Sequence, residues 1–124
     1  MNAGPHVEMS AVSARSGPTC SEKSGLSDAD LQHIVTAAQA LPNIHKLVLF
    51  GSRAKGNYKP GSDVDLSIDC TNAGYETAVR LASQLNEETT MPYFFDVVDY
   101  RSIAEPALID HIDRVGIVLL QRQT

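Results

Sequence analysis

Polar and apolar residues alternate strictly over residues 63–69, DVDLSID. Successive side chains of a β-strand point to opposite faces of its sheet, so Val64, Leu66 and Ile68 are predicted to share one buried face. The opposite face then carries only polar side chains, three of which are aspartates. The pattern therefore predicts a strand with one face in the core and one acidic face.

The other elements follow from shorter apolar runs and from helical spacing. Apolar or aromatic runs predict strands over residues 45–50, 93–100 and 117–120. Apolar residues at helical spacing predict three helices, which begin at Ser27, cover residues 75–88, and begin near Pro106. The order helix, strand, strand, helix, strand, helix, strand is typical of an α/β (α+β) fold with a mixed β-sheet and helices packed on it.

Several residues carry the signals of helix ends. Ser27 is expected to cap the first helix, with Asp30 completing a capping-box variant and Pro42 closing the element. Pro106 suits the first turn of the last helix, and Gly116 suits its C-terminal cap. The middle helix is expected to bury a stripe of four residues: Tyr75, Ala78, Ala82 and Leu85.

The N-terminal segment differs from the rest of the chain. Residues 1–25 are rich in Ser, Gly, Pro and Ala without sustained periodicity, so we expect a disordered tail. Met9 is an alternative start that the sequence does not settle. Residues 26–124 then form one domain, as the length of 124 residues indicates.

Charge and cysteine content narrow the partners and the compartment. A net charge of −5 argues against a nucleic-acid or anionic-membrane surface, which requires a basic face. The chain has no apolar run near ~20 residues and no apolar signal-peptide core. Cys20 and Cys70 lack metal-like spacing and make no disulfide framework. These features predict a cytoplasmic protein with reduced thiols and no membrane partner.

The acidic face of the strand is a candidate metal site. Asp63 and Asp65 stand two residues apart, which places their side chains on one face ~6.5 to 7 Å apart along the strand. Paired carboxylates suit Mg²⁺, and two such ions can stabilise both oxygens of a phosphoryl displacement. The plainer alternative is that both acids face water, and a D-x-D pair alone favours that reading.

A third acid supports the metal site. Asp96 stands between Phe95 and Val97 in a predicted strand, where an ionised carboxylate is costly unless it is paired or metal-bound. If this strand lies beside the D-x-D strand, three carboxylates converge, and Asp96 can accept the proton of an attacking hydroxyl. The alternative is an edge-strand residue with its polar side outward. Asp99, of opposite parity, is expected to cap the next turn.

The loop before the D-x-D strand has features of a phosphate site. Gly51 lets the backbone approach an anion closely, and Ser52 offers a hydroxyl and a backbone N–H. Arg53, Lys55 and Lys59 supply positive charge in an otherwise acidic chain. The glycine spacing half-matches a P-loop, but the Lys-Ser/Thr pair is missing. For the two lysines, a plain exposed loop is an equally good explanation.

Together, G-S-R-A-x-G at residues 51–56, S-D-x-D-L at 62–66 and the later Asp96 resemble the DNA-polymerase-β-like nucleotidyltransferase superfamily. The likeness extends over residues 28–120 and is closest to the minimal nucleotidyltransferases, MNTs, whose chains often end much as HIDRVGIVLL does. The resemblance implies two Mg²⁺ ions and ATP as substrate. It implies catalytic and metal-binding roles for Asp63, Asp65 and Asp96, and nucleotide-binding roles for Gly51, Ser52, Arg53 and Ser62. Ser62 can alternatively cap the turn before the strand.

The resemblance also implies a function and a partner. MNTs are commonly paired with a small HEPN protein in toxin–antitoxin systems, so the leading hypothesis is an antitoxin that transfers AMP to a tyrosine of a HEPN ribonuclease toxin. A homo- or hetero-oligomer would then complete the site. The alternatives are a nucleotidyltransferase for a small-molecule hydroxyl such as an aminoglycoside, and a non-catalytic binding antitoxin. A nucleic-acid polymerase module is disfavoured by small size and acidic charge.

Overall fold

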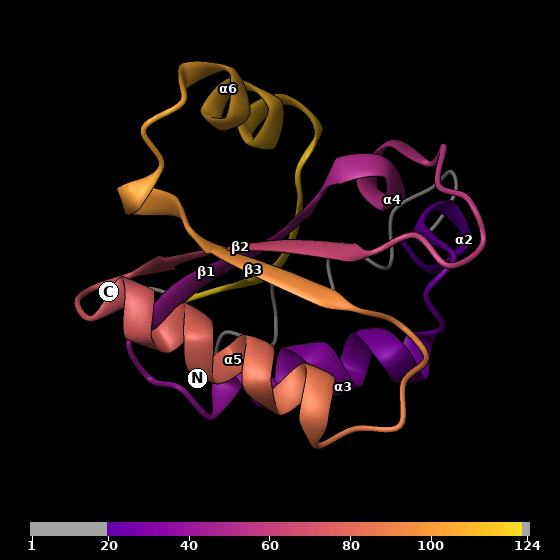
Figure 1. Ribbon diagram of the computed structural model, residues 1–124, viewed down its shortest axis with the longest axis horizontal. Coiled ribbons are helices and arrows are strands. Elements are labelled where there is room, and N and C mark those ends of the chain that lie inside the picture. Colours follow the sequence, from indigo (N-terminus) through magenta and orange to yellow (C-terminus); the bar gives the residue numbers. More distant parts are fainter. Residues whose placement is uncertain (1–19, 123–124) are drawn as a thin grey trace.

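The computed structural model describes residues 20–122, which fold around one four-stranded sheet with the strand order β3-β2-β1-β4 (Figure 1). The strands are β1 (Ile44–Phe50), β2 (Val64–Cys70), β3 (Phe95–Asp99) and β4 (Ile117–Gln121). β1 pairs antiparallel with β2 and β4, whereas β2 and β3 are parallel. The mixed sheet predicted from the sequence is therefore confirmed.

Helices lie on both faces of this sheet. In Figure 1, α3 and α5 run side by side below the sheet, while α6 lies above it and α4 follows directly after β1. The helical elements are α2 (Cys20–Ser24), α3 (Asp28–Gln39), α4 (Gly51–Lys55), α5 (Gly74–Glu87), the 3₁₀ turn η1 (Tyr100–Ser102) and α6 (Pro106–Val115). None of the helices in residues 20–122 is long and apolar enough to span a membrane.

The register between β1 and β2 separates a core face from a polar face. Leu49 pairs with Leu66 on the face covered by α3 and α5, and both side chains are fully buried. Phe50 pairs with Asp65, which places this acid on the face that α6 covers. The alternation predicted for β2 is confirmed, since Val64, Leu66 and Ile68 are all inaccessible to solvent.

The capping residues predicted for α3 and α6 are present. Gly116 occupies its predicted position for a different reason from the one expected. The Ser27 hydroxyl accepts the Asp30 N–H at 2.9 Å, and the Asp30 carboxylate accepts the Ser27 N–H at 3.2 Å, which completes the capping box. Gly116 caps α6 in an extended conformation, with a φ of −62°. A Cβ at Gly116 would overlap Val48 and the Ile112 carbonyl, so close packing explains this glycine.

The buried stripe of α5 differs from the predicted one. Ala78 and Leu85 are buried, but Tyr75 is 71% exposed, and Thr77 and Leu81 take the remaining inner positions. Thr77 is accommodated because its hydroxyl donates to the Ala73 carbonyl at 2.6 Å and accepts an Asn43 amide hydrogen at 2.7 Å. A polar side chain can occupy a buried position when its hydrogen bonds are made.

The N-terminal boundary also differs from the prediction. Helix α2 lies within the stretch expected to be a tail, and Ser24 and Leu26 are fully buried. The prediction of a disordered segment therefore does not hold for residues 20–25, whereas Met9 lies outside the described residues. Cys70 is a free, buried thiol.

A side chain of α5 fixes the outer edge of β3. Asn86 accepts the Phe95 N–H at 2.7 Å and donates to the Phe95 carbonyl at 2.9 Å. The outward backbone N–H and carbonyl of Phe95 are thereby satisfied, which blocks this position of the edge from pairing with another chain. Because Phe95 precedes Asp96, this contact also positions the strand that carries the third acid.

Asn86→Ala is expected to lower the free energy of unfolding by about 2 kcal/mol, since two partly buried backbone groups lose their partners. Chemical denaturation measures the change. Glu87→Ala, one position along the same helix and exposed, is the control and should change stability by less than about 0.5 kcal/mol. Equal effects of the two variants would contradict the bracing role of Asn86.

Candidate active site

Parallel pairing of β2 and β3 brings the predicted acids together. Asp65 is the register partner of Asp96, and Asp63 directly precedes β2. The expectation that the strand of Asp96 lies beside the D-x-D strand is confirmed. The expectation that Asp96 is buried within its strand was wrong, because β3 is an edge strand and the Asp96 side chain is exposed, which is the alternative stated above. Asp96 therefore stands at the open side of the acid group.

The pKa of Asp65 reflects its burial and the two neighbouring acids. Burial raises the pKa of the Asp65 carboxyl above its usual range, and the negative charges of Asp96 and Asp63 raise it further. All three causes disfavour the ionised form. An arrangement that keeps mutually repelling carboxylates on one face is typical of a cation site.

The acids fit a magnesium site by their chemistry. Within residues 20–122, no three His, Cys, Asp or Glu side chains lie so that they could enclose a metal by themselves. Mg²⁺ does not require such a cage, because it takes a few carboxylates and completes its shell with water and substrate phosphates. Hard carboxylate oxygens, which are the only donors that Asp63, Asp65 and Asp96 offer, suit Mg²⁺ better than Zn²⁺.

The turn after β1 places Gly51 directly against this acid group. Gly51 has a φ of +78°, and a Cβ at this position would overlap the Asp65 carboxylate. Only glycine meets both requirements, the left-handed backbone and the close approach. Ser52 follows in the first turn of α4 and is half-buried, and its carbonyl accepts the Gly56 N–H at 2.9 Å. The predicted phosphate turn and the acids thus adjoin.

Arg53 lies in a different environment from the one predicted. Its side chain is only 3% exposed, and its guanidinium donates to the carbonyls of Ser24 and Ser62. The guanidinium also lies 4.8 Å from the ring centroid of Tyr58 and 4.9 Å from that of Tyr93. Its donors hold α2 and the loop before β2 in place. The geometry therefore does not support the predicted contact of Arg53 with nucleotide.

Ser62 takes the turn-capping arrangement that the sequence left open. Its hydroxyl accepts the Lys59 N–H at 2.9 Å, which closes the turn before β2. Its carbonyl accepts the two hydrogen bonds from Arg53. These contacts fix the loop that leads into Asp63. Lys55 and Lys59 are exposed, as expected for a solvated loop.

One residue near the site was not found from the sequence. His111 of α6 accepts the Gly51 N–H through Nε2 at 3.2 Å, and its ring packs edge-on against Phe50 with centroids 6.0 Å apart. The sequence places His111 only within a helix, 60 residues from Gly51. Its position next to Ile112, which is buried against β1, is the one signal that it faces the sheet.

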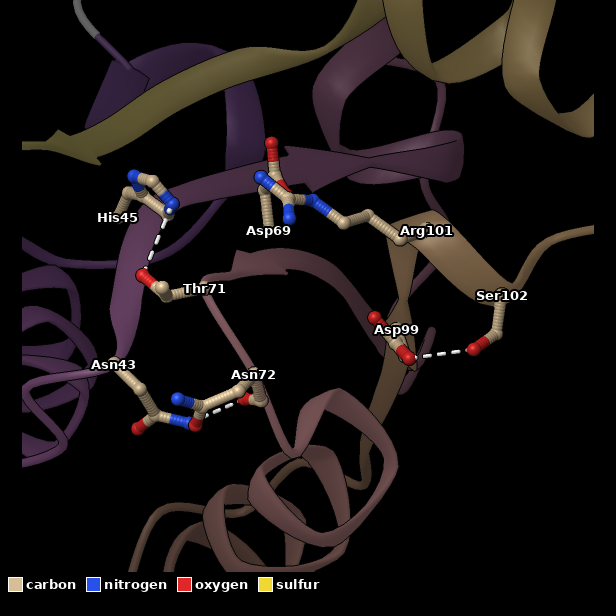
Figure 2. A network of polar contacts seen from close by, with 8 residues as sticks. All are labelled: Asn43, His45, Asp69, Thr71, Asn72, Asp99, Arg101 and Ser102. Atoms are coloured by element: carbon tan, nitrogen blue, oxygen red, sulfur yellow. Dashed lines mark hydrogen bonds and ion pairs between the residues drawn. The ribbon is translucent and has the colours of Figure 1, made fainter. Parts of the chain in front are cut away.

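A separate polar network occupies the other end of the sheet (Figure 2). The Asp69 carboxylate accepts from Arg101 at 2.5 Å, and Asp99 accepts the Ser102 hydroxyl at 2.6 Å. Asp99 stands at the N-cap of η1, but its carboxylate accepts only the Ser102 hydroxyl and no backbone N–H of that turn, so the predicted side-chain cap is absent. The acids of β2 therefore divide into two kinds, with Asp65 next to other carboxylates and Asp69 paired with an arginine.

Solved structures resemble this chain over most of its length. One is a toxin–antitoxin complex with AMP-PNP, at 27% identity over 76% of this chain and 75% of that chain, with a TM-score of 0.58. A second is the toxin–antitoxin MntA–HepT, at 25% identity, 75% and 71% coverage, and a TM-score of 0.51. A third contains tri-AMPylated Shewanella oneidensis HEPN toxin in complex with MNT antitoxin, at 25% identity, 75% and 71% coverage, and a TM-score of 0.50.

No protein with a curated description matches the chain. The model of the family described as polymerase beta, nucleotidyltransferase, matches residues 32–124, which include the glycine turn and all three acids. With the fold, the register of Asp65 and Asp96, and this match in agreement, the chain belongs to the polymerase β-like nucleotidyltransferase family.

Proposed function

We propose that this nucleotidyltransferase is an antitoxin that transfers AMP from ATP to a tyrosine hydroxyl of a HEPN ribonuclease toxin and thereby silences it. The observation that carries the proposal is the group formed by Asp63, Asp65 and Asp96 beside Gly51. The relatives support the choice of nucleotide and acceptor, since one contains AMP-PNP and another an AMPylated HEPN toxin.

Each residue has a defined task in this reaction. Gly51 and Ser52 would hold the triphosphate, and Asp63, Asp65 and Asp96 would hold Mg²⁺, which neutralises phosphate charge when bound. Asp96 would accept the proton of the attacking hydroxyl. The acceptor oxygen then bonds to the α-phosphorus, the bond to the bridging oxygen breaks, and pyrophosphate leaves.

The exposure of Asp96 bears on the acceptor. Because the Asp96 side chain is exposed, the proposed base is open to a group carried by another molecule. A protein side chain such as tyrosine can reach it without entering a deep cleft. Rate enhancement would come from positioning and charge neutralisation and not from a covalent enzyme intermediate.

The test is to incubate the chain with its cognate HEPN protein, ATP and Mg²⁺, and to weigh the HEPN protein by mass spectrometry. We expect a gain of one or more AMP units, which Asp63→Asn abolishes. Asp110→Asn, which removes an exposed acid paired with Arg114, is the control and should leave the gain intact.

Other outcomes separate the alternatives. AMP transfer to an aminoglycoside in the absence of any protein acceptor would identify a small-molecule enzyme. Full neutralisation of the toxin in cells by Asp63→Asn would show that binding alone suffices. The proposed mechanism would be contradicted if the HEPN protein gained no mass with the wild-type chain, or gained as much mass with Asp63→Asn as with the wild type.

A further inference from the structure

We propose that His111 contacts the phosphates of the bound nucleotide, and that its Nε2 atom changes from hydrogen-bond acceptor to donor when a triphosphate binds. This inference rests on the proposed function, because it takes the triphosphate to lie at Gly51 and Ser52. It adds a residue from α6, an element that carries none of Asp63, Asp65 and Asp96, to the nucleotide site.

The position of the imidazole is fixed from three sides. Ile112, the next residue of α6, is buried against Val48 and Phe50. The Phe50 ring meets the His111 ring edge-on at an interplanar angle of 79°. Nε2 then accepts the Gly51 N–H at 3.2 Å. The ring is thus held at the turn by packing as well as by its hydrogen bond.

The hydrogen bond to Gly51 defines the state of the ring without nucleotide. Since Gly51 donates, Nε2 must carry its lone pair and no hydrogen. The same N–H is the donor proposed for a phosphate oxygen, and one N–H cannot serve both acceptors at full strength. A bound phosphate would therefore displace Nε2 from Gly51.

Displacement leaves Nε2 beside a phosphate oxygen, which is an acceptor only. The neutral imidazole can place its hydrogen on either nitrogen, so Nε2 can become the donor without a change in charge. A hydrogen bond to an anionic oxygen is stronger than one between neutral groups. The exchange of one neutral bond for contacts to phosphate therefore favours the triphosphate complex.

The position of His111 also defines which part of the nucleotide it would contact. Gly51 has the Asp65 carboxylate against its Cα and His111 at its N–H. His111 therefore adjoins the turn proposed for the phosphates, while Asp96 on the edge strand faces the acceptor. Loss of His111 should weaken triphosphate binding and leave the acceptor's KM unchanged.

Calorimetric titration with Mg²⁺ and a non-hydrolysable ATP analogue, and separately with AMP, tests the proposal. We expect His111→Ala to weaken the triphosphate about tenfold and AMP by much less, because only the triphosphate extends along the turn. His111→Gln, whose amide can both accept and donate, should restore most of the affinity. His33→Ala, at an exposed position of α3, is the control.

Nitrogen NMR of the His111 ring supplies a readout that a purely structural role would not move. Nε2 should change from pyridine-type to pyrrole-type when the ATP analogue binds. Unchanged or tighter triphosphate binding by His111→Ala, an equal loss for AMP, or an unchanged Nε2 resonance would overturn the inference. If the wild type binds no triphosphate, the proposed function fails as well. If the wild type binds triphosphate and His111→Ala binds it equally well, only the role of His111 is contradicted and the proposed function is unaffected.

Discussion

Asp65→Asn is expected to abolish nucleotidyl transfer and yet to leave the folded protein at least as stable as the wild type. Asparagine keeps the shape of the side chain but removes the negative charge that would hold Mg²⁺. Loss of one preorganised electrostatic contact to a phosphoryl centre lowers the rate by about 10³-fold. The gain in stability follows because the charge is partly buried and lies near two other carboxylates.

The pH dependence of stability follows from the same pKa. Because the pKa of Asp65 is higher in the folded than in the unfolded protein, the folded state binds this proton more tightly. Stability from this group is therefore present at low pH and decreases as the pH rises from about 4, the unfolded value, through the folded value. Asparagine does not titrate, so the variant lacks this decrease.

Two measurements check the prediction. Transfer rates should be compared with those of Asp69→Asn, which changes an acid on the same face of β2 that is paired with Arg101. Thermal unfolding without Mg²⁺ should show that Asp65→Asn melts no lower than the wild type at pH 7, with the advantage shrinking toward pH 4. Wild-type activity, or a lower melting temperature at pH 7, would count against the assignment of Asp65.

Arg53→Lys is expected to lower the free energy of unfolding by about 3 kcal/mol, although the charge is kept. The planar guanidinium donates to two carbonyls and lies between two tyrosine rings. A lysine ammonium cannot donate to both carbonyls with the same planar geometry, and it cannot stack on the tyrosine rings as a guanidinium does. The buried carbonyl of Ser24 and the partly buried carbonyl of Ser62 would lose hydrogen bonds.

Chemical denaturation and nucleotide titration of the same variant separate the two roles of Arg53. If it is a structural residue, the dissociation constant for the ATP analogue should stay unchanged while the denaturation midpoint falls. Arg80→Lys makes the same change at an exposed position of α5 and should alter stability by less than about 0.5 kcal/mol. A stable Arg53→Lys variant with weakened nucleotide binding would restore the role first predicted.

Local patterns predicted the elements of this fold well. The alternation of Val64, Leu66 and Ile68 and the capping residues of α3 express rules that act within a few residues. The pairing of Asp65 with Asp96 was predicted only under the assumption that their strands are neighbours. That assumption came from chemistry and from the resemblance and not from any local pattern.

The sequence did not predict what each side chain contacts across the fold. Tyr75 fits the period of a buried stripe, but α5 turns it outward. Arg53 fits a phosphate loop in composition, yet the carbonyls of Ser24 and Ser62 lie where its fork can reach them. His111 lies 60 residues from Gly51, the residue whose N–H it accepts. Periodicity and motif spacing contain no information on such partners.

Asp65 belongs to the central strand β2 and Asp63 directly precedes it, whereas Asp96 belongs to β3, which pairs with another strand on one side only. Edge strands open in local fluctuations that leave the rest of a domain folded. The amides of β3 should therefore exchange with solvent faster than those of β2. Each opening separates the third acid from the other two, so that, if Asp96 has the proposed role, competence for transfer should be lost under milder conditions than those that unfold the domain.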